Sequence, residues 1–425
     1  MRTIIAPGKI KGLITAPSSK SMTQRAFATA LLQHSTTTIY FTGDSEDEKS
    51  ALSIISQLGA RIVSQTSGKL VVESNGVAPL TNTINCGESG LAARLFTPIA
   101  SLAENPVSIT GVGSLLKRPM YGFNQALTSL GISVQNFNGY LPVTVHGPME
   151  SLSFQLNAAN GSQFLSGLLF ALAYSAKEFV TIEVADLKSK PYIDLTLEML
   201  LNTGRPVFHD NYTSFYIDPA LFAPKNNLEI TIEGDWSGSA NFLVAAAIAG
   251  TITINNLNIT SRQADVAILT ALRLAGAIVE TADNTITVTT APLTCFNFDA
   301  THCPDLFPCL AILAACSSGE SEIKGIHRLH DKESNRIESI AEMLQNFDVP
   351  FSLEDDAFCI TGVRQLHGTV IDAYNDHRIV MAAAIGALRA NGPVDILQSE
   401  AVHKSYPAFF NDLSLCGVTV REQEG

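Results

Sequence analysis

Residues 268–290 read ILTALRLAGAIVETADNTITVTT, and this stretch holds the pattern that decides the fold. Its apolar residues follow helical spacing up to Gly276, and further along Ile286 and Val288 alternate with threonines. Apolar positions three or four apart are typical of one helix face, whereas strict alternation is typical of a half-buried strand. The stretch therefore predicts a helix, a break at the glycine, and two strands joined by a turn.

The same pattern occurs six times along the 425 residues, at 51–73, 126–146, 196–218, 268–290, 340–361 and 409–422. The breaking residues are 72, 73, 72, 72 and 69 positions apart, and they are Gly59, Gly131, Gly204, Gly276, Asp348 and Gly417. A unit of about seventy residues buries little apolar surface alone, so we expect the copies to share cores. Two groups of three copies, divided near residues 226–235, are the simplest arrangement, with a ligand cleft between the groups.

The composition is that of a globular, acidic protein. Of its residues 46% are hydrophobic, and 27 Lys and Arg stand against 40 Asp and Glu. A net charge of −13 without basic runs argues against a nucleic-acid role. The longest apolar stretch, 164–176, is shorter than the roughly 20 residues of a membrane helix, and the first residues carry no export signal. We expect a cytoplasmic protein with no membrane segment, whose seven cysteines are free thiols and not metal ligands.

The positive charges fall in short blocks, which in an acidic chain indicates a local site for a small, multiply charged anion. Three apolar helices are predicted to open with Lys20-Ser21, with residues 87–90 and with residues 161–163. Helix N-termini offer free N–H groups and a positive dipole end to anions. Serine and glycine are also ordinary capping residues, so only the combination of the three segments supports an anion site.

Two further blocks are more specific. If a helix runs through residues 332–336, Lys332 and Glu333 lie four and three positions before Arg336, and all three share one face. The alternative is an exposed, ion-paired turn. In the second block, His377 lies between an acid and Arg378 at the start of an apolar helix, which favours catalysis or anion contact over a structural role.

Taken together, these blocks resemble the 5-enolpyruvylshikimate-3-phosphate synthase family, which joins phosphoenolpyruvate to shikimate 3-phosphate. The matching segments keep the family's order over nearly the whole chain, at residues 17–25, 118–120, 162–165, 189–194, 233–235, 332–336, 374–378 and 404. The resemblance implies an α/β, two-lobed enolpyruvyl transferase fold with six repeated units of about 72 residues, three per lobe with pseudo-threefold symmetry. It also implies a first lobe at 18–232, a discontinuous second lobe at 1–17 and 233–425, and an active site in the interlobe cleft.

The reaction implied by the resemblance is an addition followed by an elimination: the 5-hydroxyl attacks C2 of phosphoenolpyruvate, and phosphate then leaves. The family's motifs make Glu333 the proton donor to C3 and Asp305 the base near the hydroxyl, and Lys20, His377 and Lys404 complete the catalytic set. At least one carboxyl must act as acid and then as base. Neither a metal nor an organic cofactor is implied, and we expect a monomer.

Binding residues follow from the same resemblance. Those expected at phosphoenolpyruvate are Lys20, Arg118, Gln163, Arg336, Arg378 and Lys404, with Arg94 in indirect support. Gly90 and Arg328 are also expected in the substrate site. Those expected at shikimate 3-phosphate are Ser21, Arg25, Ser162, Ser189, Tyr192, Asp305 and Lys332.

Four positions depart from the family's usual pattern. Glu88 places a carboxylate in the glycine loop, and Gly161 replaces the first of two serines. Leu95 stands where many members have proline, and Arg328 stands where many have asparagine, where it can compensate for the missing hydroxyl. The departures bear on affinity more than on reaction type. For the family's inhibitor glyphosate, Gly90 favours sensitivity, whereas Glu88, Leu91 and Leu95 favour tolerance.

Two alternatives remain at this point. The first is the enolpyruvyl transferase that acts on UDP-N-acetylglucosamine, whose members usually carry a cysteine in the loop that here reads GSLLK at 113–117. The second is a non-catalytic anion-binding paralogue, against which the retained Asp305, Lys332, Glu333, His377 and Lys404 argue.

Overall fold

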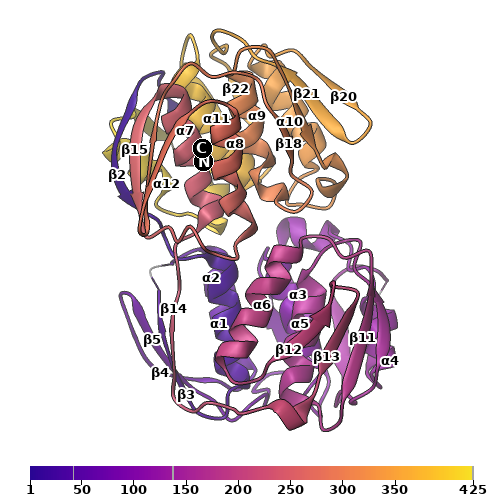
Figure 1. Cartoon of the computed structure of the whole chain (residues 1–425). Helices are drawn as coiled ribbons and strands as arrows, with labels where there is room; N and C mark the ends of the chain where they lie inside the picture. The colour runs from indigo at the N-terminus through magenta and orange to yellow at the C-terminus, as the bar shows by residue number, and fades with distance from the viewer. Residues whose placement is uncertain (42, 136–137, 424–425) are drawn as a thin grey trace. The chain divides into compact units, whose positions relative to one another are not determined.

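The computed structural model describes residues 1–41, 43–135 and 138–423. The chain divides into two compact units. We call residues 18–232 the continuous unit and residues 1–17 with 233–425 the discontinuous unit. Within the described residues the strands form six four-stranded sheets, three in each unit (Figure 1). None of the helices in this described part is long and apolar enough to cross a membrane.

The continuous unit contains six α-helices in its described part. They are α1 (Lys20–Leu32), α2 (Glu46–Gln57), α3 (Gly90–Ala100), α4 (Phe123–Ser129), α5 (Gln163–Ser175) and α6 (Lys190–Asn202). Its first sheet has the order β14-β3-β5-β4, with β3 (Thr36–Tyr40), β4 (Arg61–Thr66), β5 (Lys69–Glu73) and β14 (Leu228–Thr231). The second has the order β6-β7-β9-β8, with β6 (Thr83–Asn85), β7 (Val107–Thr110), β8 (Ser133–Gln135) and β9 (Val143–His146). The third has the order β10-β11-β13-β12, with β10 (Phe154–Asn157), β11 (Val180–Ala185), β12 (Val207–Asp210) and β13 (Ser214–Ile217).

The discontinuous unit repeats this content in its described part. Its α-helices are α7 (Trp236–Ala249), α8 (Ile268–Leu274), α9 (Phe307–Ala315), α10 (Arg336–Asn346), α11 (His377–Gly386) and α12 (Phe409–Leu415). The sheet β16-β17-β15-β2 contains β2 (Ile10–Thr15), β15 (Gly250–Asn255), β16 (Ile278–Ala282) and β17 (Thr285–Thr289). The sheet β18-β19-β21-β20 contains β18 (Asn297–Asp299), β19 (Glu320–Lys324), β20 (Phe351–Glu354) and β21 (Ala357–Thr361). The sheet β22-β23-β1-β24 contains β1 (Arg2–Ile5), β22 (Val370–Asp372), β23 (Val394–Leu397) and β24 (Val420–Gln423).

All six sheets have one layout: an edge strand runs parallel to its neighbour, and the other two strands are antiparallel. The six breaking residues all have φ between 60° and 110°. A residue in this left-handed region ends a helix and turns the chain into the next strand, and glycine adopts it most easily. Gly204 has a second constraint, because a Cβ there would lie 2.0 Å from the carbonyl oxygen of Ala223. The predicted repeat of α/β units is therefore confirmed.

The sixth copy differs from its prediction. Two strands were expected in residues 409–422, but this segment contains only β24. Its antiparallel partner is β1, which pairs Arg2 with Gln423 and Ile5 with Val420. The sixth sheet is thus completed by residues from the start of the chain, and the pattern of one segment could not reveal that partner.

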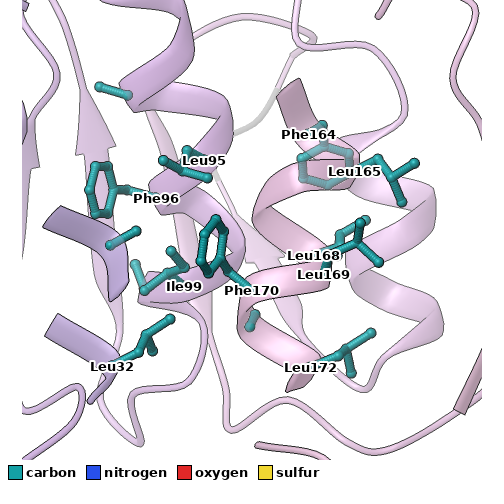
Figure 2. Close-up of a cluster of buried hydrophobic side chains, with 14 of the residues drawn as sticks. Leu32, Leu95, Phe96, Ile99, Phe164, Leu165, Leu168, Leu169, Phe170 and Leu172 are labelled. Atoms are coloured by element: carbon teal, nitrogen blue, oxygen red, sulfur yellow. The ribbon is translucent and has the colours of Figure 1, made fainter. Parts of the chain in front are cut away.

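Each unit packs three apolar helices against one another: α1, α3 and α5 in the continuous unit, and α7, α9 and α11 in the discontinuous unit. These helices are buried on nearly all faces, as expected for helices that are apolar all round. Figure 2 shows the first of these cores, where Phe96 and Ile99 of α3, Phe170 of α5 and Leu32 of α1 fill the interior. Full burial of one such side chain stabilises the fold by about 1.5–3 kcal/mol.

Candidate active site

In the continuous unit most of the predicted site residues lie at or within the first two turns of α1, α3, α5 and α6, whereas Arg118 follows a short 3₁₀ helix. Gln24 of α1 donates to Ser89 Oγ at the start of α3, at 3.4 Å. Arg94 of α3 approaches Gln163 Oε1, the first residue of α5, at 3.5 Å. Because free N–H groups and positive dipole ends meet there, this end of the helix bundle favours anions.

Arg25 joins three of these helix ends. Its side chain is 1% exposed, and it donates to Thr196 Oγ1 at 2.9 Å, to the Ser21 carbonyl at 2.8 Å and to the Tyr192 carbonyl at 3.0 Å. A longer contact, 3.4 Å, reaches Ser166 Oγ on α5. Burial lowers the pKa of Arg25 to about 10, against a smaller rise caused by Tyr192. The guanidinium therefore supports the site from within the fold and keeps its positive charge.

Lys20 has an acidic partner that the sequence pattern did not reveal. Its Nζ lies 2.8 Å from Asp47 Oδ2, on the first turn of α2, and both side chains are nearly buried. An anion that approaches Lys20 therefore meets an ammonium group whose position is already defined by a carboxylate.

The segment that carries Arg118 packs against the start of α3. Arg94 donates to the carbonyls of Gly90 at 3.1 Å and Pro119 at 2.9 Å. A Cβ on Gly90 would lie 2.5 Å from Arg118 Nη1. The absence of a side chain at position 90 is therefore what admits the Arg118 guanidinium.

Glu88, one of the four departures, has a clear structural contact. Its Oε2 accepts from the backbone N of Ser114 at 3.0 Å and from Ser114 Oγ at 2.7 Å. A Cβ on Gly113 would lie 2.5 Å from the Glu88 carboxyl carbon. Glu88 thus anchors the short 3₁₀ helix η1 (Gly113–Lys117), which leads directly into Arg118.

The remaining predicted residues of this unit lie at the starts of α5 and α6. Ser162 is the N-cap of α5 and is buried, and Gln163 follows it. Ser189 is the N-cap of α6, with φ 56° and ψ 46°. A left-handed conformation costs energy for serine and is found preferentially at functional sites. Tyr192 is half-buried in the first turn of α6.

In the discontinuous unit, Arg336 is the centre of a carboxylate cluster. Its side chain is 1% exposed, and it donates to Asp305 Oδ1, Glu333 Oε2 and Asp376 Oδ2, each at 2.8 Å. Together these negative charges hold the pKa of Arg336 well above its usual value, although burial acts to lower it. The predicted acid and the predicted base, Glu333 and Asp305, are therefore brought together by one guanidinium.

Lys332 and Glu333 do not lie on a helix. The α10 helix begins at Arg336, and both residues belong to the bend that precedes it. The helical face is therefore wrong, and the alternative of an ion-paired turn is closer, because Glu333 lies in a bend and pairs with Arg336. The turn is not exposed at Arg336, which is buried. The Nζ of Lys332 lies 3.6 Å from Asp305 Oδ1.

Burial and the charges of this cluster together shift the pKa values of Asp305 and Lys332. Burial alone would raise the pKa of Asp305, but Lys332, Arg336 and Arg378 outweigh it and hold that pKa well below 3.8. Burial lowers the pKa of Lys332 to about 8, and the neighbouring arginines add to this against the opposite effect of Asp305. Asp305 is therefore a carboxylate at neutral pH, and Lys332 can gain or lose a proton slightly above it.

Arg378, His377 and Lys404 surround the start of α11. Arg378 is 4% exposed, and its Nη2 lies 3.6 Å from Asp305 Oδ2, too far for a hydrogen bond. Its Nε and Nη1 are buried without a hydrogen-bond partner among the residues that the structure describes. His377 is buried with Nδ1 3.9 Å from Asp376 Oδ1, and Lys404 donates to the Asn375 carbonyl at 2.7 Å. Arg378 therefore offers two donors to an incoming anion.

Sequence reasoning left Asp376 out of the site. Asp376 is fully buried, accepts from Arg336, and caps α11 by accepting from the backbone N of Arg378 at 2.9 Å. Its place directly before His377 was the available signal. Arg328, by contrast, lies in the short 3₁₀ helix η5 (Ile326–Arg328) and acts on the pKa of Lys332 as a like charge.

Comparisons with known proteins identify the family of this chain. Residues 4–413 match the family model of EPSP synthase (3-phosphoshikimate 1-carboxyvinyltransferase). The 3-phosphoshikimate 1-carboxyvinyltransferase of Clostridium novyi is 33% identical over 432 aligned residues, which cover 98% of either chain. That of Methanocorpusculum labreanum is 31% identical, with all of both chains covered.

Solved structures show the same likeness. EPSP synthase from Acinetobacter baumannii superposes with a TM-score of 0.83 at 25% identity, covering 99% of this chain and 100% of the other. The enolpyruvyl transferase NikO from Streptomyces tendae shares the fold, with a TM-score of 0.78 at 15% identity over 99% of this chain and 98% of the other. The family match and the full-length relatives show that this chain belongs to the EPSP synthase (3-phosphoshikimate 1-carboxyvinyltransferase) family.

Proposed function

We propose that this chain transfers the enolpyruvyl group of phosphoenolpyruvate to the 5-hydroxyl of shikimate 3-phosphate with the residues gathered in its two units. As a member of the EPSP synthase family it is an enolpyruvyl transferase of the shikimate pathway. Both substrates carry a phosphate and a carboxylate, which suit arginine forks and helix N-termini.

The observation that carries this assignment is the state of Arg378. A buried guanidinium with two nitrogens that lack hydrogen-bond partners is costly, and oxyanion acceptors at those nitrogens remove that cost. Within the described residues, Nε and Nη1 of Arg378 lack hydrogen-bond partners, while Asp305 stands at 3.6 Å from Nη2. We therefore assign Arg378 to phosphoenolpyruvate, together with Arg336 and Lys404 of the same unit.

The chemistry requires one proton to enter and leave at C3. As the O5–C2 bond forms, the hydroxyl proton leaves the sugar and C3 gains a proton. In the second half, the C2–O bond to phosphate breaks and C3 loses a proton. We assign the C3 proton to Glu333, whose carboxylate is positioned by Arg336. Since one group serves both halves, it must act as acid and then as base.

Asp305 and Lys332 have different roles at the 5-hydroxyl of shikimate 3-phosphate. The lowered pKa of Asp305 makes it a good hydrogen-bond acceptor but a weak base. Lys332, 3.6 Å away and with a pKa near 8, is better matched to hold the proton in transit. In place of the prediction from the family resemblance that Asp305 is the base, we therefore assign Asp305 to orienting the hydroxyl and Lys332 to accepting the proton.

The test is release of inorganic phosphate from phosphoenolpyruvate by purified protein. The arms contain shikimate 3-phosphate, UDP-N-acetylglucosamine, or neither, and the variants are Glu333→Gln and, as matched control, Glu338→Gln, an exposed residue of α10. We expect release only with shikimate 3-phosphate, lost in Glu333→Gln and retained in Glu338→Gln. Release with UDP-N-acetylglucosamine would refute the substrate assignment. Binding of both ligands without release would indicate a non-catalytic paralogue.

Two finer expectations, a monomer and a cytoplasmic location, remain predictions. Light scattering coupled to size exclusion tests the first: a mass near 45.4 kDa is expected for a monomer.

A further inference from the structure

Asp265 is a buried carboxyl that no step above uses. It lies in the short 3₁₀ helix η3 (Ala264–Ala267) and has no exposed surface. Ser237 Oγ, in the first turn of α7, donates to Asp265 Oδ2, while Oδ1 is buried without a hydrogen-bond partner in the part of the chain that the structure describes. A buried carboxylate with one unsatisfied oxygen is costly, and protonation of that oxygen relieves the cost.

The position of Asp265 is built into the fold. Gln263, two residues earlier, accepts from the backbone N of Trp236 at 3.1 Å and donates to the Gly234 carbonyl at 2.8 Å. These bonds tie η3 to the start of α7, and Ser237 adds a third link to the same turn. Asp265 is therefore held where it is independently of any ligand.

The charges around Asp265 belong to the candidate active site. The like charges are Asp305 and Asp235, the N-cap of α7, and the opposite charge is Arg378 of α11. The thiols of Cys303 and Cys309 also face it, and Asp265 helps to raise the pKa of both after the larger effect of their burial. Burial, followed by Asp305, raises the pKa of Asp265 to about 7, against the lowering effects of Arg378 and Ser237.

We propose that Asp265 is a positioning residue that takes up a proton from solvent when an anionic substrate pairs with Arg378. Among the described residues, the carboxylates of Asp305, Asp235 and Asp265 act on Arg378 together with the like charge of Arg336. Ionised Asp265 therefore helps to balance the guanidinium charge. Once the carboxylate or phosphate of phosphoenolpyruvate takes over that role, two negative groups compete for one cation, and Asp265 becomes the neutral acid. One proton is gained from solvent, and no covalent bond to substrate is made. This inference rests on the proposed function, because it assigns the anion at Arg378 to phosphoenolpyruvate.

The consequence is that protonated Asp265 favours substrate capture. In the free enzyme Asp265 loses its proton around pH 7, so kcat/KM for phosphoenolpyruvate falls as pH rises through this range. Lys332, with a pKa near 8, and the substrate phosphate also titrate nearby, so the informative quantity is a ratio between variant and wild type at each pH. Asp265→Asn resembles the neutral acid and can still accept from Ser237.

We expect the ratio of kcat/KM, Asp265→Asn over wild type, to rise severalfold between pH 6.5 and 8.5, by at most tenfold per pH unit. Asp355→Asn is the matched control, since Asp355 is exposed between β20 and β21 of the same unit, and its ratio should stay flat. A flat ratio for Asp265→Asn would overturn the inference. A ratio that falls with pH would overturn it as well, because it would mean that the ionised form captures substrate.

Ser237→Ala gives an independent test that does not depend on Asp265→Asn being folded. The hydrogen bond from Ser237 lowers the pKa of Asp265, so its loss should move the fall in kcat/KM to higher pH. An unmoved profile would count against the inference. Failure of the proposed function and failure of this inference give different results. If the wild type releases no phosphate, both the proposed function and the inference are overturned. If the wild type is active but the kcat/KM ratio does not change with pH, only the inference is overturned.

Discussion

Replacement of Arg336 by glutamine should strongly destabilise the discontinuous unit. Arg336 is 1% exposed and donates to three carboxylates at 2.8 Å, of which Asp376 has no exposed surface. Glutamine cannot reach all three groups and carries no charge. The variant therefore leaves a buried carboxylate without its cation, a change that costs about 3–5 kcal/mol.

A double variant distinguishes the effect of the unpaired buried charge from the effect of the lost arginine side chain. In Arg336→Gln with Asp376→Asn, the buried carboxylate is also neutral, so the loss of stability should be smaller than in Arg336→Gln alone. The cost should also depend on pH. In the folded protein the pKa of Asp305 is well below 3.8, the value of an unfolded aspartate. The stabilising ion pair of Asp305 with Arg336 is therefore fully present above pH 3.8 and is lost as the pH falls through the pKa of the folded protein. The difference in the free energy of unfolding between wild type and Arg336→Gln should therefore become smaller near pH 3.

The single tryptophan of the chain, Trp236, is fully buried in the same unit, so its fluorescence during urea unfolding reports this unit. A loss of this size lowers the unfolding midpoint by roughly 1–2 M urea. Arg273→Gln, at an exposed arginine of α8, is the control and should stay within about 0.5 kcal/mol of wild type. A cost below 1 kcal/mol for Arg336→Gln, or a double variant less stable than the single one, would refute the reasoning.

Three further changes test other parts of the site. Gly90→Ala should raise KM for phosphoenolpyruvate severalfold in steady-state assays with little change in melting temperature. The reason is that the new Cβ would lie 2.5 Å from Arg118 Nη1 and would displace the guanidinium; an unchanged KM would contradict this. The free energy of unfolding of Lys332→Gln, measured with urea, should fall relative to that of wild type between pH 8 and 10.5, by about 3.4 kcal/mol at most. The reason is that native Lys332 releases its proton near pH 8 while the unfolded chain keeps it until 10.5; parallel stability curves would refute the shift. Arg25→Met should cost about 2–3 kcal/mol in thermal unfolding, because the carbonyls of Ser21 and Tyr192 lose their donor; a neutral effect would show that burial of the charge cancels its hydrogen bonds.

Local pattern predicted the elements of the fold well, and it failed where partners are distant in sequence. The breaking residues, such as Gly276 and Asp348, are recognisable because a helix end and a left-handed turn involve only a few neighbouring residues. The partner of β24 was missed because β1 lies at the opposite end of the chain. Of the two interpretations of Lys332 and Glu333, the helical face was wrong and the ion-paired turn was closer, because a bend ahead of α10 brings Glu333 to Arg336.

The residues of the candidate site were also predicted only in part from the sequence. The residue types and their family motifs pointed to Arg336, Arg378, Asp305 and Glu333, and their roles remain predictions. The pairing of Lys20 with Asp47 was not visible, because an acid in a helix of charged residues reads as an exposed face. Asp265 carried no signal at all, since an isolated aspartate in a loop is ordinary until its burial is known.

By itself the sequence determined a sixfold α/β repeat, an acidic chain with clustered cations, and the motifs of one enzyme family. These properties are local: helical spacing, strand alternation and helix breaks are set by residues close together along the chain. Only the tertiary structure decided that Asp305, Glu333 and Asp376 share one arginine, and that Lys332 and Asp265 titrate near neutral pH. These properties depend on burial and on contacts such as those of Arg336 with Asp305 and Asp376, which lie 31 and 40 positions away and which no single segment of sequence contains.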